Sequence, residues 1–355
     1  MRKSFDVLLL PGDGIGPEVV GAAREVVDAA AEHFGIDVRY EERRIGGTAI
    51  REEGEPVSAE TLEAAGASDS VLLGAVGHPD FDDAPVRPEA GLLKLRKSLG
   101  AFANLRPVAA IPALLGSSPL KREVVDGVDV LIVRELTGGA YFGEKVEGEE
   151  WASDLSVYTR EEIERVARVA FDAAKRRKQR VTSVDKANVM ATSRLWRRVV
   201  SEVAEDYPGV SLDHILVDAA AMFLVQAPAR FDVVLTENLF GDILSDEAAM
   251  LPGSMGMLPS ASLGKPGSPG IFEPVHGSAP DIAGEGKANP YATILSAAMM
   301  FRHALGRPDV AEAIEQGVSV ALETHFLTPD VGGKKTTEEV TKAVSKWVAA
   351  GEGVA

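Results

Sequence analysis

Two aspartates four residues apart, Asp242 and Asp246, could supply metal chemistry. A helix over residues 241–246 would place both carboxylates on one face, where like charges repel each other. An oxygen-preferring divalent cation such as Mg²⁺ or Mn²⁺ would relieve that repulsion, with Asp218 as a further ligand at the end of the strand-like residues 215–217. From the spacing alone, a helix N-terminus stabilised by Asp242, with Asp246 solvated, remains the simpler interpretation.

Three arginines occupy positions where an anion could meet them. Arg96 lies in an apolar helix-like run, Arg106 follows Asn104-Leu105, and Arg134 ends the run 130–133. A guanidinium after a buried strand needs a carboxylate partner. That partner could be an Asp or Glu of the chain or a carboxylate of a ligand, and the sequence leaves both open.

A lysine and a tyrosine could move protons. Lys186 closes the strand-like run 181–184, at the edge where α/β folds collect ligands. Beside a metal its ammonium form is disfavoured, which is what a lysine base requires. Tyr141 lies on the glycine-flanked segment 138–143, although such a tyrosine is more often a packed aromatic with its hydroxyl at the surface.

The elements that must position these residues alternate between strands and helices. The clearest helix covers about residues 160–178, where Thr159 and Glu162 form a capping box ahead of an apolar stripe. A stretch rich in Gly, Pro and Ser, residues 252–270, predicts irregular backbone. The strand-like runs are residues 7–10, 71–73, 128–133, 181–184 and 233–235. This alternation predicts an α/β fold with much parallel pairing.

The glycine-rich segment 11–17, Pro-Gly-Asp-Gly-Ile-Gly-Pro, joins a strand to a helix, with Pro17 in the first helical turn. Its glycines are spaced G-x-G-x-G, whereas the dinucleotide fingerprint requires G-x-G-x-x-G. We therefore interpret it as a tight turn that needs unusual backbone angles. Such a turn can still lie near a bound cofactor.

Composition excludes several classes of protein. The 355 residues, 45% hydrophobic and 26% charged, can form one large α/β unit or two domains. Because cysteine is absent, the chain has no disulfide, thiolate nucleophile or Cys-ligated metal. The net charge of −17 argues against nucleic-acid and anionic-membrane partners. Neither a signal peptide nor a bilayer-spanning apolar run is evident, so a cytoplasmic protein is expected.

Taken together, these segments resemble the isocitrate/isopropylmalate family of β-decarboxylating dehydrogenases over essentially the whole chain. The matching motifs are PGDGIGPE at 11–18, GLLKLRKSLGAFANLRP at 91–107, VDVLIVRELTGGAYFGE at 128–144, SVDKANV at 183–189, FGDILSDEAAM at 240–250, GSMGMLPSASLG at 253–264 and EPVHGSAPDIAG at 273–284. The resemblance implies NAD-dependent oxidative decarboxylation of (2R,3S)-3-isopropylmalate to 2-oxoisocaproate, CO₂ and NADH, the third step of leucine biosynthesis. The alternatives are a related enzyme acting on D-malate, tartrate or homoisocitrate and, from another class, a non-catalytic dicarboxylate-binding protein.

The resemblance also implies a two-domain isopropylmalate dehydrogenase-like α/β fold, with a large mixed sheet flanked by helices and without Rossmann topology. The first domain, residues 1–101 and 253–355, holds both chain ends and binds the cofactor. The second domain, residues 102–252, forms the interface of a homodimer and carries metal and substrate residues. The active site is expected in the interdomain cleft. The partner subunit would complete this site with Lys186, Asn188, Val189 and Asp218, of which Asn188 and Val189 contact the substrate.

In the family, the charged and proton-moving side chains serve one reaction. The two malate carboxylates are bound by Arg96, Arg106 and Arg134, and Mg²⁺ or Mn²⁺ is ligated by Asp218, Asp242 and Asp246. Lys186, helped by Asp218, removes the substrate's hydroxyl proton while the C2 hydride passes to the nicotinamide. Tyr141, with Lys186 near it, then protonates the enolate that decarboxylation leaves.

Cofactor binding is assigned mainly to residues 276–282. An acidic side chain such as Asp281 accepts hydrogen bonds from the adenosine ribose but repels a 2′-phosphate, which favours NAD over NADP. Asn289 completes the site and, directly before Pro290, is also a good helix N-cap. The expected cofactor contacts are Ile15, Glu89, His276, Gly277, Ser278, Ala279, Asp281, Ile282 and Asn289.

Substrate selection is assigned to Glu89, Leu92 and Leu93. In isocitrate-specific relatives the corresponding stretch offers polar groups to a third carboxylate. Burying an isopropyl group against the two leucines gains roughly 2 kcal/mol, whereas an unpaired carboxylate placed there loses several kcal/mol. The pocket is therefore predicted to select mainly by rejecting charge.

Overall fold

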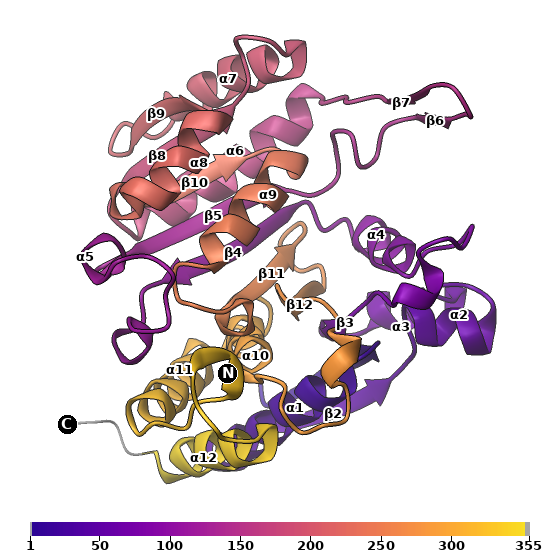
Figure 1. Ribbon diagram of the computed structural model, residues 1–355, viewed down its shortest axis with the longest axis vertical. Helices are drawn as coiled ribbons and strands as arrows, with labels where there is room; N and C mark the ends of the chain where they lie inside the picture. The colour runs from indigo at the N-terminus through magenta and orange to yellow at the C-terminus, as the bar shows by residue number, and fades with distance from the viewer. Residues whose placement is uncertain (1, 352–355) are drawn as a thin grey trace. The chain divides into compact units, whose positions relative to one another are not determined.

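The computed structural model describes residues 2–351, which form two compact units (Figure 1). The first unit contains the described residues up to Ala101 and from Ser254 onward, so both ends of the described chain belong to it. The second unit is Phe102–Gly253. Both units combine strands with covering helices, so the α/β prediction is confirmed.

The first unit is built on neighbouring strands in the order β2-β1-β3-β12-β11. The first four run parallel, while β11 pairs antiparallel with β12, so the sheet is mixed as predicted. The strands are β1 (Ser4–Gly12), β2 (Asp37–Glu42), β3 (Ser70–Ala75), β11 (Pro259–Leu263) and β12 (Gly270–Pro274). Alternate residues of β1 face opposite sides of the sheet, and Leu8 and Leu10 pack in one buried cluster with Leu73 and Leu95.

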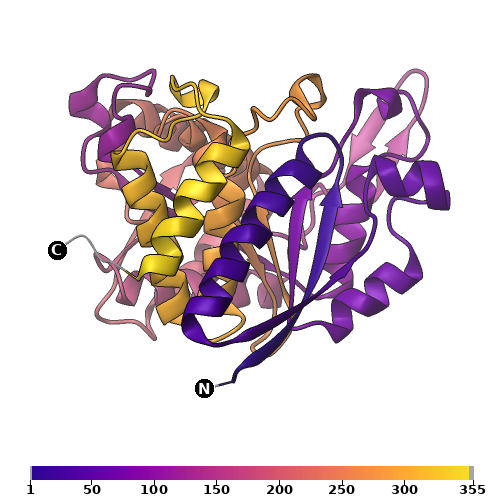
Figure 2. The ribbon, with the colours of Figure 1, turned by 90° about the horizontal axis from the view of Figure 1, so that it is seen from below.

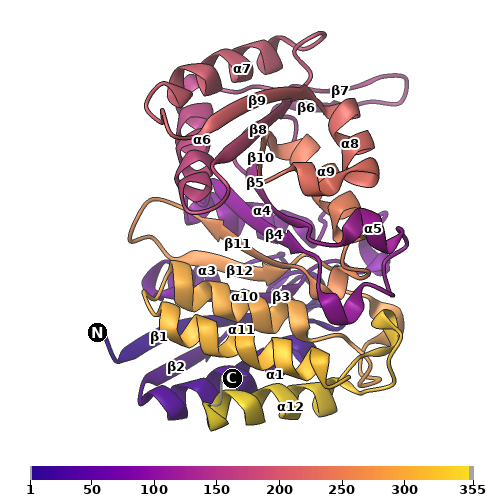
Figure 3. The ribbon, with the colours of Figure 1, turned by 90° about the vertical axis from the view of Figure 1, so that its left-hand side faces the viewer.

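Helices cover the strands of the first unit. Figures 2 and 3 show α1, α10, α11 and α12 lying side by side, and α1 and α10 contact the strands directly. Leu95 of α4 and Ala65 of α3 belong to the cluster that contains Leu8. The helices are α1 (Gly16–Phe34), α2 (Gly47–Glu53), α3 (Ala59–Ala67), α4 (Glu89–Ser98), α10 (Tyr291–His303), α11 (Pro308–Glu323) and α12 (Thr337–Ala350).

The second unit is also a mixed sheet, with strands in the order β4-β5-β10-β8-β9. Only β4 is antiparallel to its neighbour. The strands are β4 (Ala103–Ala109), β5 (Asp129–Glu135), β8 (Arg180–Asp185), β9 (Ser211–Leu216) and β10 (Val233–Thr236), with β6 (Lys145–Glu147) and β7 (Ala152–Asp154) forming a separate hairpin. Because Arg134 lies near the end of β5 and Lys186 directly follows β8, the parallel strands deliver both to the same edge of the sheet.

Two helix pairs flank this sheet, α6 with α7 on one face and α8 with α9 on the other (Figure 3). The predicted capping box of Thr159 and Glu162 is confirmed at the start of α6, and the stripe from Ile163 to Ala174 is buried. The helices are α5 (Arg122–Val125), α6 (Arg160–Lys175), α7 (Ala191–Ala204), α8 (Val217–Gln226) and α9 (Asn238–Ala249). Within residues 2–351, no helix is both long and apolar enough to cross a membrane.

Two local expectations were wrong. Irregular backbone was predicted over 252–270, yet β11 lies inside it, because Pro259-Ser260-Ala261-Ser262 pairs with β12 and is buried. The helix bearing the two aspartates begins at Asn238, so Asp242 lies beyond its first turn. The side chain of Glu237, which accepts a hydrogen bond from Phe240 N, caps that helix instead.

Candidate active site

Asp242 is the centre of a charged cluster in the second unit. Arg134 Nη1 donates to Asp242 Oδ1, and the Tyr141 hydroxyl donates to Asp242 Oδ2 over 2.9 Å. Arg106 Nη2 lies 3.7 Å from Asp242 Oδ1, and Arg106 Nη1 lies 3.4 Å from Asp246 Oδ1. Both aspartates project from one face of α9 because they are one turn apart. Five of the residues singled out in the sequence therefore lie together.

The two arginines of this cluster are held by neutral side chains as well as by carboxylates. Arg106 Nε donates to Asn104 Oδ1 over 2.7 Å, and its Nη1 donates to Ser245 Oγ over 2.6 Å. A Cβ atom on Gly241 would lie 2.6 Å from Arg134 Cγ, so this glycine lets the arginine lie against α9. Both guanidinium groups are buried, and their orientation is fixed before any ligand arrives.

Burial and charge shift the protonation of this cluster. Burial raises the pKa of Asp246, and the negative charge of Asp242 raises it further, against the opposing effect of Arg106. Burial and the hydrogen bond to Asp242 raise the pKa of Tyr141 to about 12, so its hydroxyl is protonated at neutral pH and can donate a proton. The two carboxylates, whose side chains are 34% and 54% exposed, are oxygen ligands of the kind that a hard divalent cation prefers.

Lys186 and Asp218 form a separate pair in the second unit. Lys186 Nζ lies 3.0 Å from Asp218 Oδ1, and this hydrogen bond lowers the pKa of Asp218. Asn188 and Val189 follow on an exposed loop. Across residues 2–351 no three acidic or histidine side chains gather closely enough to hold a metal ion, so a single chain does not bring Asp218 to the Asp242 cluster.

The third predicted substrate arginine, Arg96, lies in the first unit. Its Nη2 donates to Glu273 Oε1 over 2.8 Å, and both side chains are almost fully buried. The Nε of Arg96 is buried and has no hydrogen-bond partner within the described part of the chain. Each of the three predicted arginines thus contacts a carboxylate of the chain itself, while Arg96 keeps an unused donor.

Much of the predicted cofactor segment packs on the glycine turn. Ile15 N donates to Ser278 O over 2.8 Å, and the Ile15 side chain packs in one apolar cluster with Ala279 and Ile282. Ala279 has a φ of 37°, a backbone conformation that is costly for a residue with a side chain and that often marks a binding site. Asp281 is exposed beside this cluster.

Two other predicted cofactor residues differ in their surroundings. The Nε2 atom of His276 is buried without a hydrogen-bond partner among residues 2–351, and burial lowers the pKa of the imidazole. Asn289 is not the N-cap residue, because α10 starts at Tyr291 with Pro290 as its cap. Its Oδ1 nevertheless accepts a hydrogen bond from Tyr291 N over 3.0 Å, so it satisfies the helix end.

The predicted specificity residues lie on the first turns of α4. Glu89 is its first residue, while Leu92 and Leu93 are half-buried. Leu92 packs against the core cluster that contains Leu8 and Leu95.

The sequence model of the isocitrate/isopropylmalate dehydrogenase family matches the chain over residues 6–344, a range that includes α4 and every predicted site residue.

The chain belongs to the isocitrate/isopropylmalate dehydrogenase family.

Individual relatives agree with this membership. The chain is 54% identical to the 3-isopropylmalate dehydrogenase of Geobacillus kaustophilus, covering 98% of this chain and 97% of that protein. It is 51% identical to the chloroplastic 3-isopropylmalate dehydrogenase 2 of Arabidopsis thaliana, covering 98% and 90%. These matches confirm the resemblance found in the sequence.

Solved structures of the family share the fold. An isocitrate dehydrogenase from Methylococcus capsulatus has a TM-score of 0.87 and 36% identity, over 98% of this chain and all of that one. A β-decarboxylating dehydrogenase from Thermococcus kodakarensis has a TM-score of 0.81 and 40% identity, over 98% and 96%. The prediction of an isopropylmalate dehydrogenase-like fold is confirmed.

Three buried residues next to the Asp242 cluster were not predicted from the sequence. They are Tyr158, Glu237 and Asn238. The Tyr158 hydroxyl donates to Glu237 Oε2 and accepts a hydrogen bond from Asn238 N, each over 3.0 Å. Asn238 Oδ1 accepts from Arg134, and its Nδ2 donates to Gly138 O in the segment that carries Tyr141. The signal available was a polar Glu-Asn pair placed between a buried strand and a helix.

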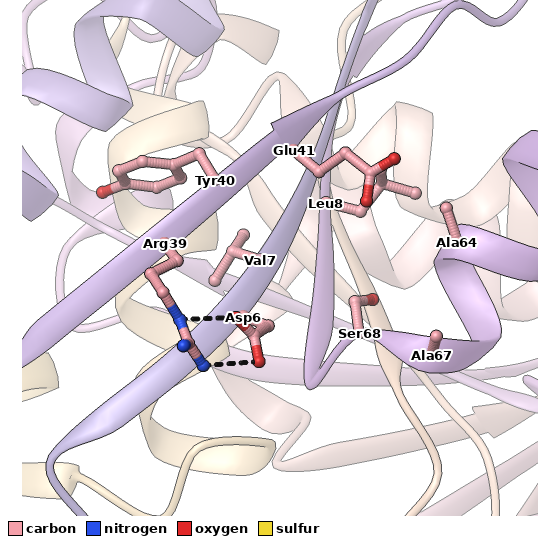
Figure 4. Close-up of a pocket in the computed structure, with 9 residues that line it drawn as sticks. All are labelled: Asp6, Val7, Leu8, Arg39, Tyr40, Glu41, Ala64, Ala67 and Ser68. Atoms are coloured by element: carbon pink, nitrogen blue, oxygen red, sulfur yellow. Dashed lines mark hydrogen bonds and ion pairs between the residues drawn. The ribbon is translucent and has the colours of Figure 1, made fainter.

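A surface hollow of about 210 Å³ in the first unit lies apart from these residues (Figure 4). It is lined by β1, β2 and α3, and Arg39 on its wall pairs with Asp6 over 2.8 Å. It contains none of the residues predicted to act on substrate or cofactor. We therefore do not assign the family reaction to it.

Proposed function

We propose that this chain catalyses the NAD-dependent oxidative decarboxylation of 3-isopropylmalate to 2-oxoisocaproate, a step of leucine biosynthesis, with the cytoplasm as its compartment. The observation that carries the proposal is the Asp242 cluster. In this cluster Arg106 and Arg134, which can bind carboxylates, lie beside the protonated hydroxyl of Tyr141. The cluster also contains the carboxylates of Asp242 and Asp246, which could ligate a metal ion. Relatives named for this reaction are more than half identical to the chain.

Asp242 and Asp246 fit a hard divalent cation, Mg²⁺ or Mn²⁺, and we propose Asp218 of a second subunit as the third ligand. Bringing a cation to the pair would relieve the repulsion that contributes to the raised pKa of Asp246. When bound, the cation polarises the 2-oxo group and stabilises the negative charge that develops as CO₂ leaves.

The proposed cofactor is NAD, held by the first unit. The unused Nε2 of His276 lies just before the segment that packs on Ile15, and the exposed carboxylate of Asp281 lies within it. The imidazole can form a hydrogen bond with an adenosine group, and the carboxylate can accept hydrogen bonds from the ribose hydroxyls. Asp281 favours NAD because it would repel a 2′-phosphate. When bound, NAD accepts the hydride from C2 of the substrate.

The remaining steps are assigned to side chains of the protein. Arg96, Arg106 and Arg134 bind and orient the two substrate carboxylates. Lys186 would accept the proton of the C2 hydroxyl as the C2–H bond breaks, once Asp218 has left its ion pair with this lysine to ligate the cation. After the C3–CO₂ bond breaks, the Tyr141 hydroxyl gives its proton to C3, which converts the enolate into the 2-oxo group and leaves only the C1 carboxylate charged.

A homodimer would complete this site. Apolar side chains are exposed on α8 and α9, the helices that carry the three proposed metal ligands, and on the β6–β7 hairpin. Because so many apolar groups are exposed to water, their burial against another chain is favourable. They are Met222, Val225, Ile243 and Met250 on or next to α8 and α9, and Val146, Trp151, Leu155 and Val157 in and beside the hairpin. We propose that these surfaces meet their copies in the partner subunit.

The proposal is tested by following NADH, 2-oxoisocaproate and CO₂ from 3-isopropylmalate and NAD, with Mg²⁺ and again with a chelator. We expect all three products in equal amounts with the metal and almost none without it. NADH formed without CO₂, or equal rates in the presence of the chelator, would contradict the proposed reaction.

A further inference from the structure

Asp13, in the middle of the glycine turn, has a buried carboxylate that accepts hydrogen bonds from two other segments of the chain. Asp13 is only 3% exposed. Oδ2 accepts hydrogen bonds from Gly47 N over 2.8 Å and from Gly77 N over 2.9 Å. Oδ1 accepts from Thr48 N over 2.8 Å and from Thr48 Oγ1 over 3.0 Å. One carboxylate therefore ties the turn to the start of α2 and to the residues after β3.

The surrounding glycines are required for this enclosure. A Cβ on Gly46 would lie 2.4 Å from Asp13 Oδ2, and one on Gly47 would lie 3.2 Å from Oδ1. Gly12 and Gly14 on either side of Asp13 have φ angles of 75° and 57°, which other residues rarely adopt. These glycines therefore leave the space in which the Asp13 carboxylate is enclosed.

The segments that Asp13 fixes are those that border the proposed cofactor loop. A Cβ on Gly14 would lie 1.9 Å from Ser278 O, and Ile15 N donates to that same oxygen. On the other side, a Cβ on Gly77 would lie 3.0 Å from Glu89 Oε1 and 3.9 Å from Ser278 Oγ. Both Gly14 and Gly77 therefore adjoin Ser278, and Asp13 lies between them in the hydrogen-bond network.

We propose that Asp13 is a positioning residue for NAD binding: it fixes the turn 12–16 and Gly77 so that they hold Ser278 in place. This inference rests on the proposed function, because NAD is the ligand concerned. The Asp13 carboxylate is enclosed by groups of the protein and is not itself a proposed cofactor contact. Its effect is transmitted through the backbone of the turn and of Gly77, since a buried carboxylate with four donors strongly restrains the groups that it binds.

The direct test is Asp13→Asn, which keeps the size of the side chain but replaces one acceptor oxygen by a donor nitrogen. We expect the dissociation constant of NADH, titrated by fluorescence without substrate or metal, to rise about tenfold or more. The KM for 3-isopropylmalate at saturating NAD should stay within about twofold. Hydrogen exchange of residues 276–282 in the free protein should become faster.

Thr48→Val supplies a milder second variant, because it removes one of the four donors and leaves the carboxylate intact. We expect NADH binding to weaken about threefold, in the same direction as for Asp13→Asn. Asp37→Asn, at an exposed aspartate of the first unit, is the control and should bind NADH like the wild type.

The outcomes separate this inference from the proposed function. If the wild type binds no NADH, the proposed function is contradicted. If the wild type binds NADH and Asp13→Asn binds it equally well, the positioning role is overturned. It is also overturned if affinity for NADH and for 3-isopropylmalate fall together, which indicates general loosening. Should Asp13→Asn fail to fold, wild-type affinity in Thr48→Val overturns it.

Discussion

The side-chain carbonyl of Asn238 accepts two hydrogen bonds from Arg134, from Nε over 3.2 Å and from Nη2 over 2.8 Å. Asn238→Ala removes both and leaves a buried guanidinium with fewer acceptors. Since a hydrogen bond to a charged group contributes about 1.5–3 kcal/mol, we expect the KM for 3-isopropylmalate to rise about tenfold or more. The KM for NAD should not change. Steady-state kinetics with each substrate varied in turn will show this.

Tyr158→Phe is the matched comparison for that prediction. It removes the hydroxyl that joins Glu237 to Asn238 N but leaves the contacts between Asn238 and Arg134 in place. We expect a lower melting temperature with a smaller change in KM. An equal rise in KM in both variants would show that Asn238 acts through general stability and not through Arg134.

Lys186→Met is expected to abolish turnover and preserve binding. The loss of a positioned proton acceptor lowers kcat by roughly 10²–10⁴-fold. Calorimetric titration should find 3-isopropylmalate bound with an affinity close to that of the wild type. Lys178→Met, which changes an exposed lysine of the same unit, serves as the control and should retain full activity. Activity like that of the wild type in Lys186→Met would remove the lysine from the mechanism.

Leu93→Ala tests the selection of the isopropyl group. Because Leu93 is half-buried and does not pack against the core cluster that Leu92 contacts, we expect the melting temperature to change little. The value of kcat/KM for 3-isopropylmalate should fall roughly 10–100-fold, whereas that for D-malate should be unaffected. Leu92→Ala should lower the melting temperature as well. An equal loss for both substrates in Leu93→Ala would contradict a role in specificity.

Glu237 predicts a pH dependence of stability. Burial raises the pKa of this carboxyl in the folded chain, in spite of hydrogen bonds from Phe240 N and Tyr158. The folded state then binds more protons than the unfolded state, so this group's contribution to the free energy of unfolding falls as pH rises from its unfolded pKa through its folded pKa. Glu237→Gln removes that dependence. The melting temperature of the variant, relative to the wild type, should therefore improve as the pH rises above 4.5, the ordinary pKa of this carboxyl. A relative decline would contradict the raised pKa.

The sequence contained enough information for the α/β class and for strands β1, β3, β5, β8 and β10. Residues 7–10 are all buried, so their apolar character is continuous, and the capping box at Thr159 has a local mechanism. The strand β11 was missed because its small polar residues are buried by pairing with β12, a contact that no local pattern reveals.

The sequence predicted some features of the site and missed others for a similar reason. The spacing of Asp242 and Asp246 is a local property of a helix, and the structure shows both on one face of α9. Their partners, Arg134 and Tyr141, reach them from about a hundred residues away, which only the fold can reveal. The hydrogen bonds of Asp13 to Gly47 and Gly77 are likewise long-range, so the glycine turn was interpreted only as a tight turn.

The central claim is tested most directly by comparing kcat/KM for 3-isopropylmalate, D-malate, tartrate, homoisocitrate and isocitrate, each with NAD and Mg²⁺. We expect the kcat/KM for 3-isopropylmalate to exceed that for every other substrate by about tenfold or more, because the leucines of α4 favour an apolar group and reject a third carboxylate. An equal or higher value for any of the other four substrates would contradict it.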